Sequence, residues 1–120
     1  MITIREPDFE FEDDRGKLTQ LVREGFSQVN IVRSKAGTVR GGHCHRLNKE
    51  AFYIIEGRVE VALRRDGEAQ THVFGPGAMF VIDEGVFHDF RFTEDTLLVG
   101  LYSRGVETGD GKMDIIPERE

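Results

Sequence analysis

The sequence predicts an all-β protein in which short antiparallel strands form a sandwich or a barrel. Apolar and polar residues alternate over short runs, which is the periodicity of a half-buried strand. Turn-forming sequences separate the runs, and glycine is abundant, at 14 of the 120 residues, as expected for many tight turns. Regularly spaced short strands with such turns are typical of antiparallel sandwiches and barrels.

The expected strands follow one another along most of the chain. They cover residues 2–4, 17–23, 28–33, 38–45, 51–55, 59–64, 70–74, 78–82, 86–92 and 96–102. Alternation is weak over 17–23, whereas residues 59–64 alternate apolar and mostly charged side chains, as a strand with one buried face does. The polar, glycine-rich segment from Arg104 onward is the candidate for a flexible tail.

The turns between these strands contain the residues that tight turns need. Asp66-Gly67 is a strong hairpin signal, and Gly75-Pro76-Gly77 is a clear turn. Gly41-Gly42 interrupts the strand at 38–45, which indicates a bulge or a close approach by a ligand. Because no repeat, low-complexity tract or linker is evident, we expect one domain over residues 1–120, with a core at about 26–103.

Length and charge limit the functional classes. A chain of 120 residues can form a single core, and a net charge of −6 argues against nucleic acid as a partner. No apolar run approaches the roughly 20 residues that cross a bilayer, and the N-terminus lacks a signal-peptide pattern. Cys44 is the single cysteine and cannot form an internal disulfide. We therefore expect a cytoplasmic protein without a membrane partner.

Titratable residues cluster around the strand at 38–45. His43 and His45 are two residues apart, so in a strand their side chains point to the same face. A turn after His45 would bring Glu50 back beside them, and His88 is a fourth candidate. The pair could instead lie on a solvated face, but neighbouring apolar strands favour a buried one. Buried histidines and a carboxylate need partners, which favours a metal or catalytic site.

Two spacings in this region are similar to the motifs of the cupin family. The first reads Gly37-x5-His43-x-His45-x4-Glu50-x6-Gly57, and the second reads Gly77-x5-Asp83-x-Gly85-x2-His88. The second departs from the family, with Asp83 where proline is usual and Phe92 where asparagine is common. The resemblance implies a single-domain jelly-roll β-barrel that holds one divalent transition metal. By position the metal ligands would be His43, His45, Glu50 and His88; zinc, nickel, iron, manganese or copper would suit them.

A narrower resemblance, from about residue 11 to 117, is to the nucleotide-sugar branch of the cupins. That branch includes dTDP-4-dehydrorhamnose 3,5-epimerases and dTDP-4-keto-6-deoxyglucose ketoisomerases. The matching residues are Asp13-Asp14-Arg15-Gly16, Gln28-x-Asn30, Ser34, Gly37, Arg40-Gly41-x-His43, residues 82–90 and the ending around 102–117. This resemblance implies that Arg15 and Arg40 hold a nucleotide diphosphate and that His43 is a base beside a ketone. These enzymes need no metal, but the full ligand set with Glu50 favours one here.

We therefore expect a metal-binding cupin that acts as a carbohydrate or nucleotide-sugar isomerase or epimerase at a carbon beside a carbonyl. With metal, the bound ion would polarise the carbonyl. Without metal, His43 or His45 can remove the proton, because the histidine pKa lies near working pH, and Tyr102 can donate from the other face. Two alternatives stay open: a metal-dependent dioxygenase, and a non-catalytic cupin that binds a sugar or another small ligand. The resemblance also implies a homodimer, often formed by exchange of N-terminal strands, and unpaired barrel edges give a physical motive.

Overall fold

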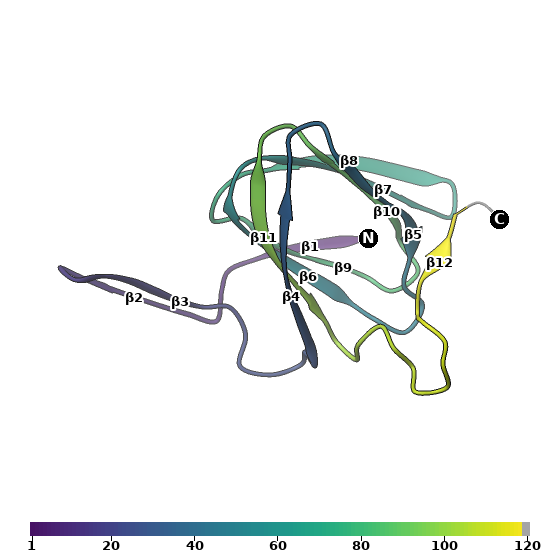
Figure 1. Ribbon diagram of the computed structural model, residues 1–120, viewed down its shortest axis with the longest axis horizontal. Coiled ribbons are helices and arrows are strands. Elements are labelled where there is room, and N and C mark those ends of the chain that lie inside the picture. The colour runs from purple at the N-terminus through teal and green to yellow at the C-terminus, as the bar shows by residue number, and fades with distance from the viewer. Residues whose placement is uncertain (119–120) are drawn as a thin grey trace.

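The computed structural model describes residues 1–118, in which twelve β-strands and no helix are found (Figure 1). The strands are β1 (Ile2–Arg5), β2 (Phe9–Asp13), β3 (Gly16–Gln20), β4 (Gln28–Ser34), β5 (Val39–Cys44), β6 (Glu50–Glu56), β7 (Val59–Arg65), β8 (Glu68–Phe74), β9 (Met79–Ile82), β10 (Phe87–Phe92), β11 (Thr96–Tyr102) and β12 (Ile116–Pro117). The all-β prediction is confirmed. No helix in the described part of the chain is long and apolar enough to span a membrane.

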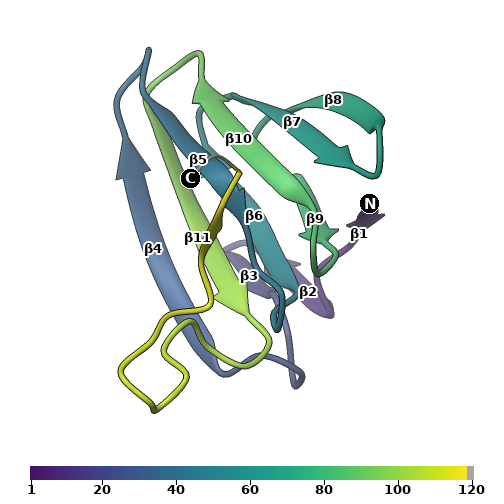
Figure 2. The ribbon, with the colours of Figure 1, turned by 90° about the vertical axis from the view of Figure 1, so that its right-hand side faces the viewer.

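Two five-stranded antiparallel sheets form the body of the protein (Figure 2). The first sheet has the order β1-β9-β6-β11-β4, and the second has the order β12-β5-β10-β7-β8. Consecutive strands often lie in different sheets, so the chain crosses repeatedly from one to the other. This arrangement places the inward faces of β6 and β11 opposite those of β5 and β10.

The core lies between the two sheets and is built by strict alternation. On β7 the side chains of Val59, Val61 and Leu63 are fully buried, while the residues between them are only half-buried. Phe80 on β9 of the facing sheet and Phe92 on β10, the strand beside β7, belong to the same core cluster. Burying each such side chain contributes about 1.5–3 kcal/mol relative to exposure. The apolar positions of the alternating pattern over residues 59–64 are therefore the side chains that β7 buries in the core.

A separate hairpin of β2 and β3 projects away from the barrel (Figure 1). Its register pairs Phe11 with Leu18 and Asp13 with Gly16. Phe9, Phe11 and Leu18 are all exposed on it. A lone two-stranded ribbon with exposed apolar side chains is marginally stable in water, so this element lacks a packing surface within its own chain.

The segment after β11, expected as a candidate flexible tail, folds back onto the barrel and is anchored there at Val106, Asp114 and β12, while residues 107–113 are exposed. The N–H of Asp114 donates to the carbonyl of Val106 at 2.7 Å. Further on, β12 pairs with β5, with Ile116 opposite Cys44 and Pro117 opposite His43. Backbone pairing and buried side chains hold this segment, although its composition is polar and rich in glycine.

Candidate active site

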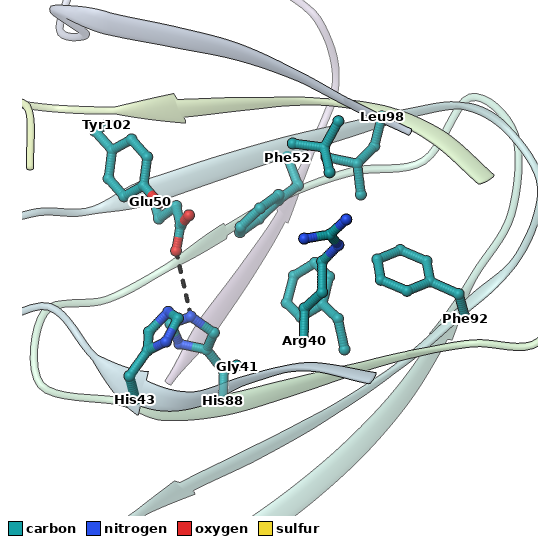
Figure 3. A pocket seen from close by; sticks show the side chains of 11 residues that line it. Arg40, Gly41, His43, Glu50, Phe52, His88, Phe92, Leu98 and Tyr102 are labelled. Atoms are coloured by element: carbon teal, nitrogen blue, oxygen red, sulfur yellow. Dashed lines mark ion pairs between the residues drawn. The ribbon is translucent and has the colours of Figure 1, made fainter. Parts of the chain in front are cut away.

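A cavity of about 210 Å³ lies between the two sheets (Figure 3). One end is polar, with the side chains of His43, His88, Glu50 and Tyr102 in its wall. The other end is apolar and aromatic, except that it contains one arginine. The residues of that end are Val32, Arg40, Phe52, Phe90, Phe92 and Leu98. The cavity thus places titratable groups beside a hydrophobic surface.

Two cross-strand pairs form the polar end. In the second sheet, His43 on β5 lies opposite His88 on β10 in the register, so both point to the same face. In the first sheet, Glu50 on β6 lies opposite Tyr102 on β11 in the same way. Figure 3 shows the two pairs on facing walls of the cavity. Strand alternation and register alone are sufficient to bring these four side chains together.

His45 lies just after the end of β5 and completes the cluster from behind the cavity wall. Ring nitrogens of His43, His45 and His88 all lie within 4.8 Å of one another. Glu50 Oε1 is 3.2 Å from His45 Nε2 and 3.4 Å from His88 Nε2. His45, Glu50 and His88 are each at most 5% exposed. The four residues predicted as metal ligands therefore lie together, with His45, Glu50 and His88 buried and His43 half-buried.

Backbone carbonyls orient two of the three imidazoles. Nδ1 of His45 lies 2.7 Å from the carbonyl oxygen of Asp114, and Nδ1 of His88 lies 3.1 Å from that of Val86. Because a carbonyl only accepts hydrogen bonds, Nδ1 carries the hydrogen in both rings. The Nε2 atoms are then directed at Glu50. Histidines that ligate metals are commonly held in this way.

Two buried polar atoms of the cluster lack a hydrogen-bond partner. Within residues 1–118, His45 Nε2 and Glu50 Oε1 make no hydrogen bond with acceptable angles, although they are close to each other. An unsatisfied buried polar atom costs about 1–3 kcal/mol. A metal ion bound between them would satisfy both atoms. Three imidazoles and a carboxylate are also a donor set that divalent transition metals accept, so the residues present fit such an ion.

The surroundings shift the pKa values of the cluster in different directions. Burial lowers the pKa of His43, and the neighbouring charges of His88 and His45 lower it further. Burial also lowers the pKa of His88. For His45, burial alone would lower the pKa, but the Glu50 carboxylate and the Asp114 carbonyl raise it overall. Burial and the charge of Glu50 raise the pKa of Tyr102 well above its usual range. At neutral pH, His43 is therefore a neutral acceptor, and the Tyr102 phenol keeps its proton.

The position of His88 depends on a bulge that only glycine permits. The register between β5 and β10 shifts between His88 and Asp89. Gly41 faces this shift with φ at +121°, and a Cβ there would lie 2.3 Å from the carbonyl oxygen of His88. The sequence predicted either a bulge or a close approach by a ligand at Gly41-Gly42; the structure confirms the bulge, and the close approach it contains is that of the β10 backbone.

The two arginines predicted to bind substrate lie in different places. Arg40 lines the apolar end of the cavity, and its Nε donates to Ser34 Oγ at 2.8 Å. Arg15 lies at the tip of the β2–β3 hairpin, where its side chain is 82% exposed and pairs with Asp13 at 2.7 Å. The structure therefore brings Arg40 to the site but leaves Arg15 outside the cavity of its own chain.

A family model described as the polysaccharide biosynthesis C-terminal domain matches residues 11–99. The chain belongs to this family. A curated relative is the spore coat polysaccharide biosynthesis protein SpsL of Bacillus subtilis (strain 168). It is 29% identical to this chain, and the match covers 75% of this chain and 70% of SpsL.

Solved structures of sugar-modifying enzymes share the fold of this polysaccharide biosynthesis domain. A 3,4-ketoisomerase from Helicobacter canadensis has a TM-score of 0.80 at 19% identity, covering 96% of this chain and 89% of that one. QdtA, a sugar 3,4-ketoisomerase from Thermoanaerobacterium thermosaccharolyticum in complex with TDP, has a TM-score of 0.78 at 21% identity. The match covers 96% of this chain and 86% of QdtA. A dTDP-4-dehydrorhamnose 3,5-epimerase from Sulfolobus tokodaii has a TM-score of 0.73 at 21% identity. The match covers 86% of this chain and 70% of the epimerase. The predicted cupin jelly roll is confirmed.

Sequence reasoning missed two buried residues behind the site of this domain, Asn48 and Asp114. They are 1% and 5% exposed, and Asn48 Nδ2 donates to Asp114 Oδ2 at 2.8 Å. Asn48 sits in a stretch that reads as a polar turn, and Asp114 sits in the glycine-rich segment. Their contacts join positions 66 residues apart, so no local pattern could have indicated them.

Proposed function

We propose that this domain is a nucleotide-sugar isomerase or epimerase that acts at a carbon beside a carbonyl. The observation that carries the proposal is that His43 and Tyr102 enter one cavity from opposite sheets. A neutral base and a protonated phenol on facing walls suit removal of a proton from one face and donation from the other. The sugar enzymes that share the fold, and the polysaccharide role named for SpsL, support the same reading.

The chemistry needs a base, an acid and a place for the negative charge. His43 takes the proton from the carbon next to the carbonyl, and the electron pair moves to the carbonyl oxygen as an enediolate. A proton returned to the same carbon from the Tyr102 side gives the epimer. A proton returned to the former carbonyl carbon, with loss of the neighbouring hydroxyl proton, gives the ketoisomer. His45 does not line the cavity, so we assign the role of base to His43 rather than to His45.

Cavity size and charge suggest how the ligand binds. A volume of about 210 Å³ is smaller than the roughly 300–1,000 Å³ of sites that enclose a drug-sized ligand. The cavity therefore suits a sugar ring, with the nucleotide outside it. Among the described residues, Ser34 is the hydrogen-bond partner of Arg40, through Nε. The terminal guanidinium nitrogens of Arg40 are then available to bind a phosphate oxygen.

A homodimer would explain the exposed hairpin. The apolar side chains of Phe9, Phe11 and Leu18 need a surface to pack on, and Val29 and Ile31 on the edge strand β4 are exposed as well. A second copy of the chain would cover such side chains and pair the free edge. In that arrangement Arg15 would reach a nucleotide diphosphate held by the partner copy rather than by its own chain.

A divalent transition metal is the proposed cofactor. His43, His45 and His88 would hold it together with Glu50, and an ion bound there would polarise a carbonyl oxygen as a Lewis acid. While it ligates the ion, His43 has no free nitrogen to accept a proton, so its role as base belongs to the protein without the ion. The same ligand set favours a second candidate, a metal-dependent dioxygenase. A non-catalytic sugar-binding cupin is the third candidate; it would bind the same ligand without turnover.

Turnover of TDP-4-keto-6-deoxyglucose, followed by NMR, tests the proposal with a matched pair of variants. We expect His43→Asn to lower the rate by about 10²–10⁴-fold, as for loss of a general base. His72→Asn changes a histidine on β8 outside the cavity and should leave the rate unchanged. Elemental analysis of the same samples tests the metal. Oxygen consumption without isomerisation would favour the dioxygenase, and binding without either reaction would favour the sugar-binding cupin.

A further inference from the structure

The segment of residues 104–118, here called the C-terminal strap, crosses the loop between β5 and β6 and ends beside β5 (Figure 2). That loop contains His45 and connects two of the strands that line the cavity. The hydrogen bonds between strap and loop centre on two buried residues, Asp114 of the strap and Asn48 of the loop.

Asp114 contacts four consecutive residues of the loop. Its Oδ1 accepts from the backbone N–H of Arg46 at 2.9 Å, and its Oδ2 accepts from that of Leu47 at 2.9 Å. The amide of Asn48 donates to Oδ2 at 2.8 Å. On the main-chain side, the Asp114 carbonyl accepts the Nδ1 hydrogen of His45 at 2.7 Å. Both polar groups of Asp114 therefore face the loop.

Asn48 fastens the other end of the strap to the same loop. Its Oδ1 accepts from the backbone N–H groups of Arg104 at 2.9 Å and Gly105 at 3.0 Å, and its Nδ2 donates to the carbonyl of Gly105 at 3.0 Å. Within the strap, the Asp114 N–H donates to Val106. These bonds close a ring of strap and loop, so the carboxylate of Asp114 determines where its carbonyl points.

We propose that Asp114 is a positioning residue that holds His45 in the tautomer with the hydrogen on Nδ1 and thereby directs Nε2 at Glu50. Three hydrogen bonds from the loop fix the carboxylate, and this fixes the carbonyl that accepts from His45. His88 offers an internal contrast, because Val86 of the adjoining loop orients it without help from the strap. The role of His45 as a metal ligand rests on the proposed function, whereas the assignment of its tautomer rests on the hydrogen bond to Asp114 alone.

Asp114→Asn is the sharpest perturbation because it preserves shape and changes only the donor pattern. One carboxylate oxygen becomes an NH2 group, which only donates. In either amide orientation this group would face a donor, either the N–H of Arg46 or the donors of Leu47 and Asn48. Asp110→Asn is the matched control, since that carboxylate lies in the same strap and, among residues 1–118, has its hydrogen-bond partners within the strap, at Thr108 and Lys112.

The test is ¹⁵N NMR of histidine-labelled full-length protein, at a pH above the titration of both rings. In the wild type and in Asp110→Asn we expect His45 and His88 each as a single Nδ1–H tautomer, with well-separated shifts for the two ring nitrogens. In Asp114→Asn we expect the two shifts of His45 to converge as the tautomers mix, while those of His88 stay apart. Because no substrate is used, failure of the proposed function would not alter this result.

Two outcomes would overturn the proposal. His45 could keep a single Nδ1–H tautomer in Asp114→Asn, in which case the carboxylate does not orient the ring. Alternatively His45 and His88 could lose their tautomers together, in which case the strap acts on the whole barrel. If Asp114→Asn does not fold, Asn48→Ala removes one of the three donors to Asp114. It should produce a smaller convergence at His45 alone, and an unchanged His45 would equally overturn the proposal.

Discussion

Replacing Gly41 by alanine would place a Cβ 2.3 Å from the carbonyl oxygen of His88 and 3.0 Å from Cα of Asp89. Both are backbone atoms, so no side-chain rotation can relieve the contact. A positive φ costs a non-glycine residue about 1–2 kcal/mol, and overpacking adds about 1–3 kcal/mol. We therefore expect Gly41→Ala to lower the free energy of unfolding by about 2–5 kcal/mol and to displace His88.

Gly42→Ala is the matched control for that prediction. Gly42 also has a positive φ, at +73°, but its Cβ would meet only Asp89 Oδ1, at 3.7 Å, which is an ordinary contact. Gly42→Ala should therefore lower the free energy of unfolding only through the positive φ, by about 1–2 kcal/mol. Urea unfolding of both variants measures the difference. If the two variants were equally stable, the close approach between β5 and β10 could not be what positions His88.

Three further predictions concern charge, packing and ligand binding. Burial alone would raise the pKa of Asp114, but its hydrogen bonds lower it overall. The ionised carboxylate of Asp114 therefore stabilises the fold above the ordinary carboxyl pKa, and this stabilisation is lost as pH falls through the lowered pKa. The difference in unfolding free energy between wild type and Asp114→Asn, measured by urea unfolding at a series of pH values, should become smaller in acid. Val61→Ala, in the core, should cost about 2 kcal/mol, whereas Val73→Ala, which is exposed, should change the unfolding free energy by less than about 0.5 kcal/mol. Arg40→Ala should weaken TDP binding, measured by calorimetry, by about 10–100-fold, as expected for loss of a charge-assisted hydrogen bond. Arg58→Ala, which removes a surface ion pair with Glu94, should leave TDP affinity unchanged. Equal TDP affinities of the two variants would contradict the placement of the phosphate at Arg40.

The barrel and the polar end of the cavity were predictable because both depend on local periodicity. Val59, Val61 and Leu63 reveal their buried face through alternation, and the spacing of His43, His45 and Glu50 indicates a shared site once a hairpin is assumed. The glycines at the bulge, Gly41, and at the hairpin turn, Gly67, likewise mark features that depend on a few adjacent positions.

What could not be predicted depends on contacts between distant parts of the chain. The polar, glycine-rich composition of the strap predicts a flexible tail. Asp114 is nevertheless buried, and its carboxylate accepts hydrogen bonds from residues more than 60 positions away in the sequence. The distance of Arg15 from the cavity follows from the outward direction of the β2–β3 hairpin, which no periodicity specifies. Arg40 was expected beside a ligand only by resemblance, and its place among three phenylalanines depends on the packing of both sheets.

Proton exchange at the carbon beside the carbonyl is the measurement that tests the proposed chemistry most directly. TDP-4-keto-6-deoxyglucose incubated with the protein in D2O should gain deuterium at that carbon, as seen by ¹H NMR. His43→Asn should slow the exchange by about 10²–10⁴-fold, and His72→Asn should leave it unchanged. A wild-type protein that binds this sugar but exchanges no proton, or an exchange rate unaffected by His43→Asn, would contradict the assignment of the cavity as a site of proton transfer.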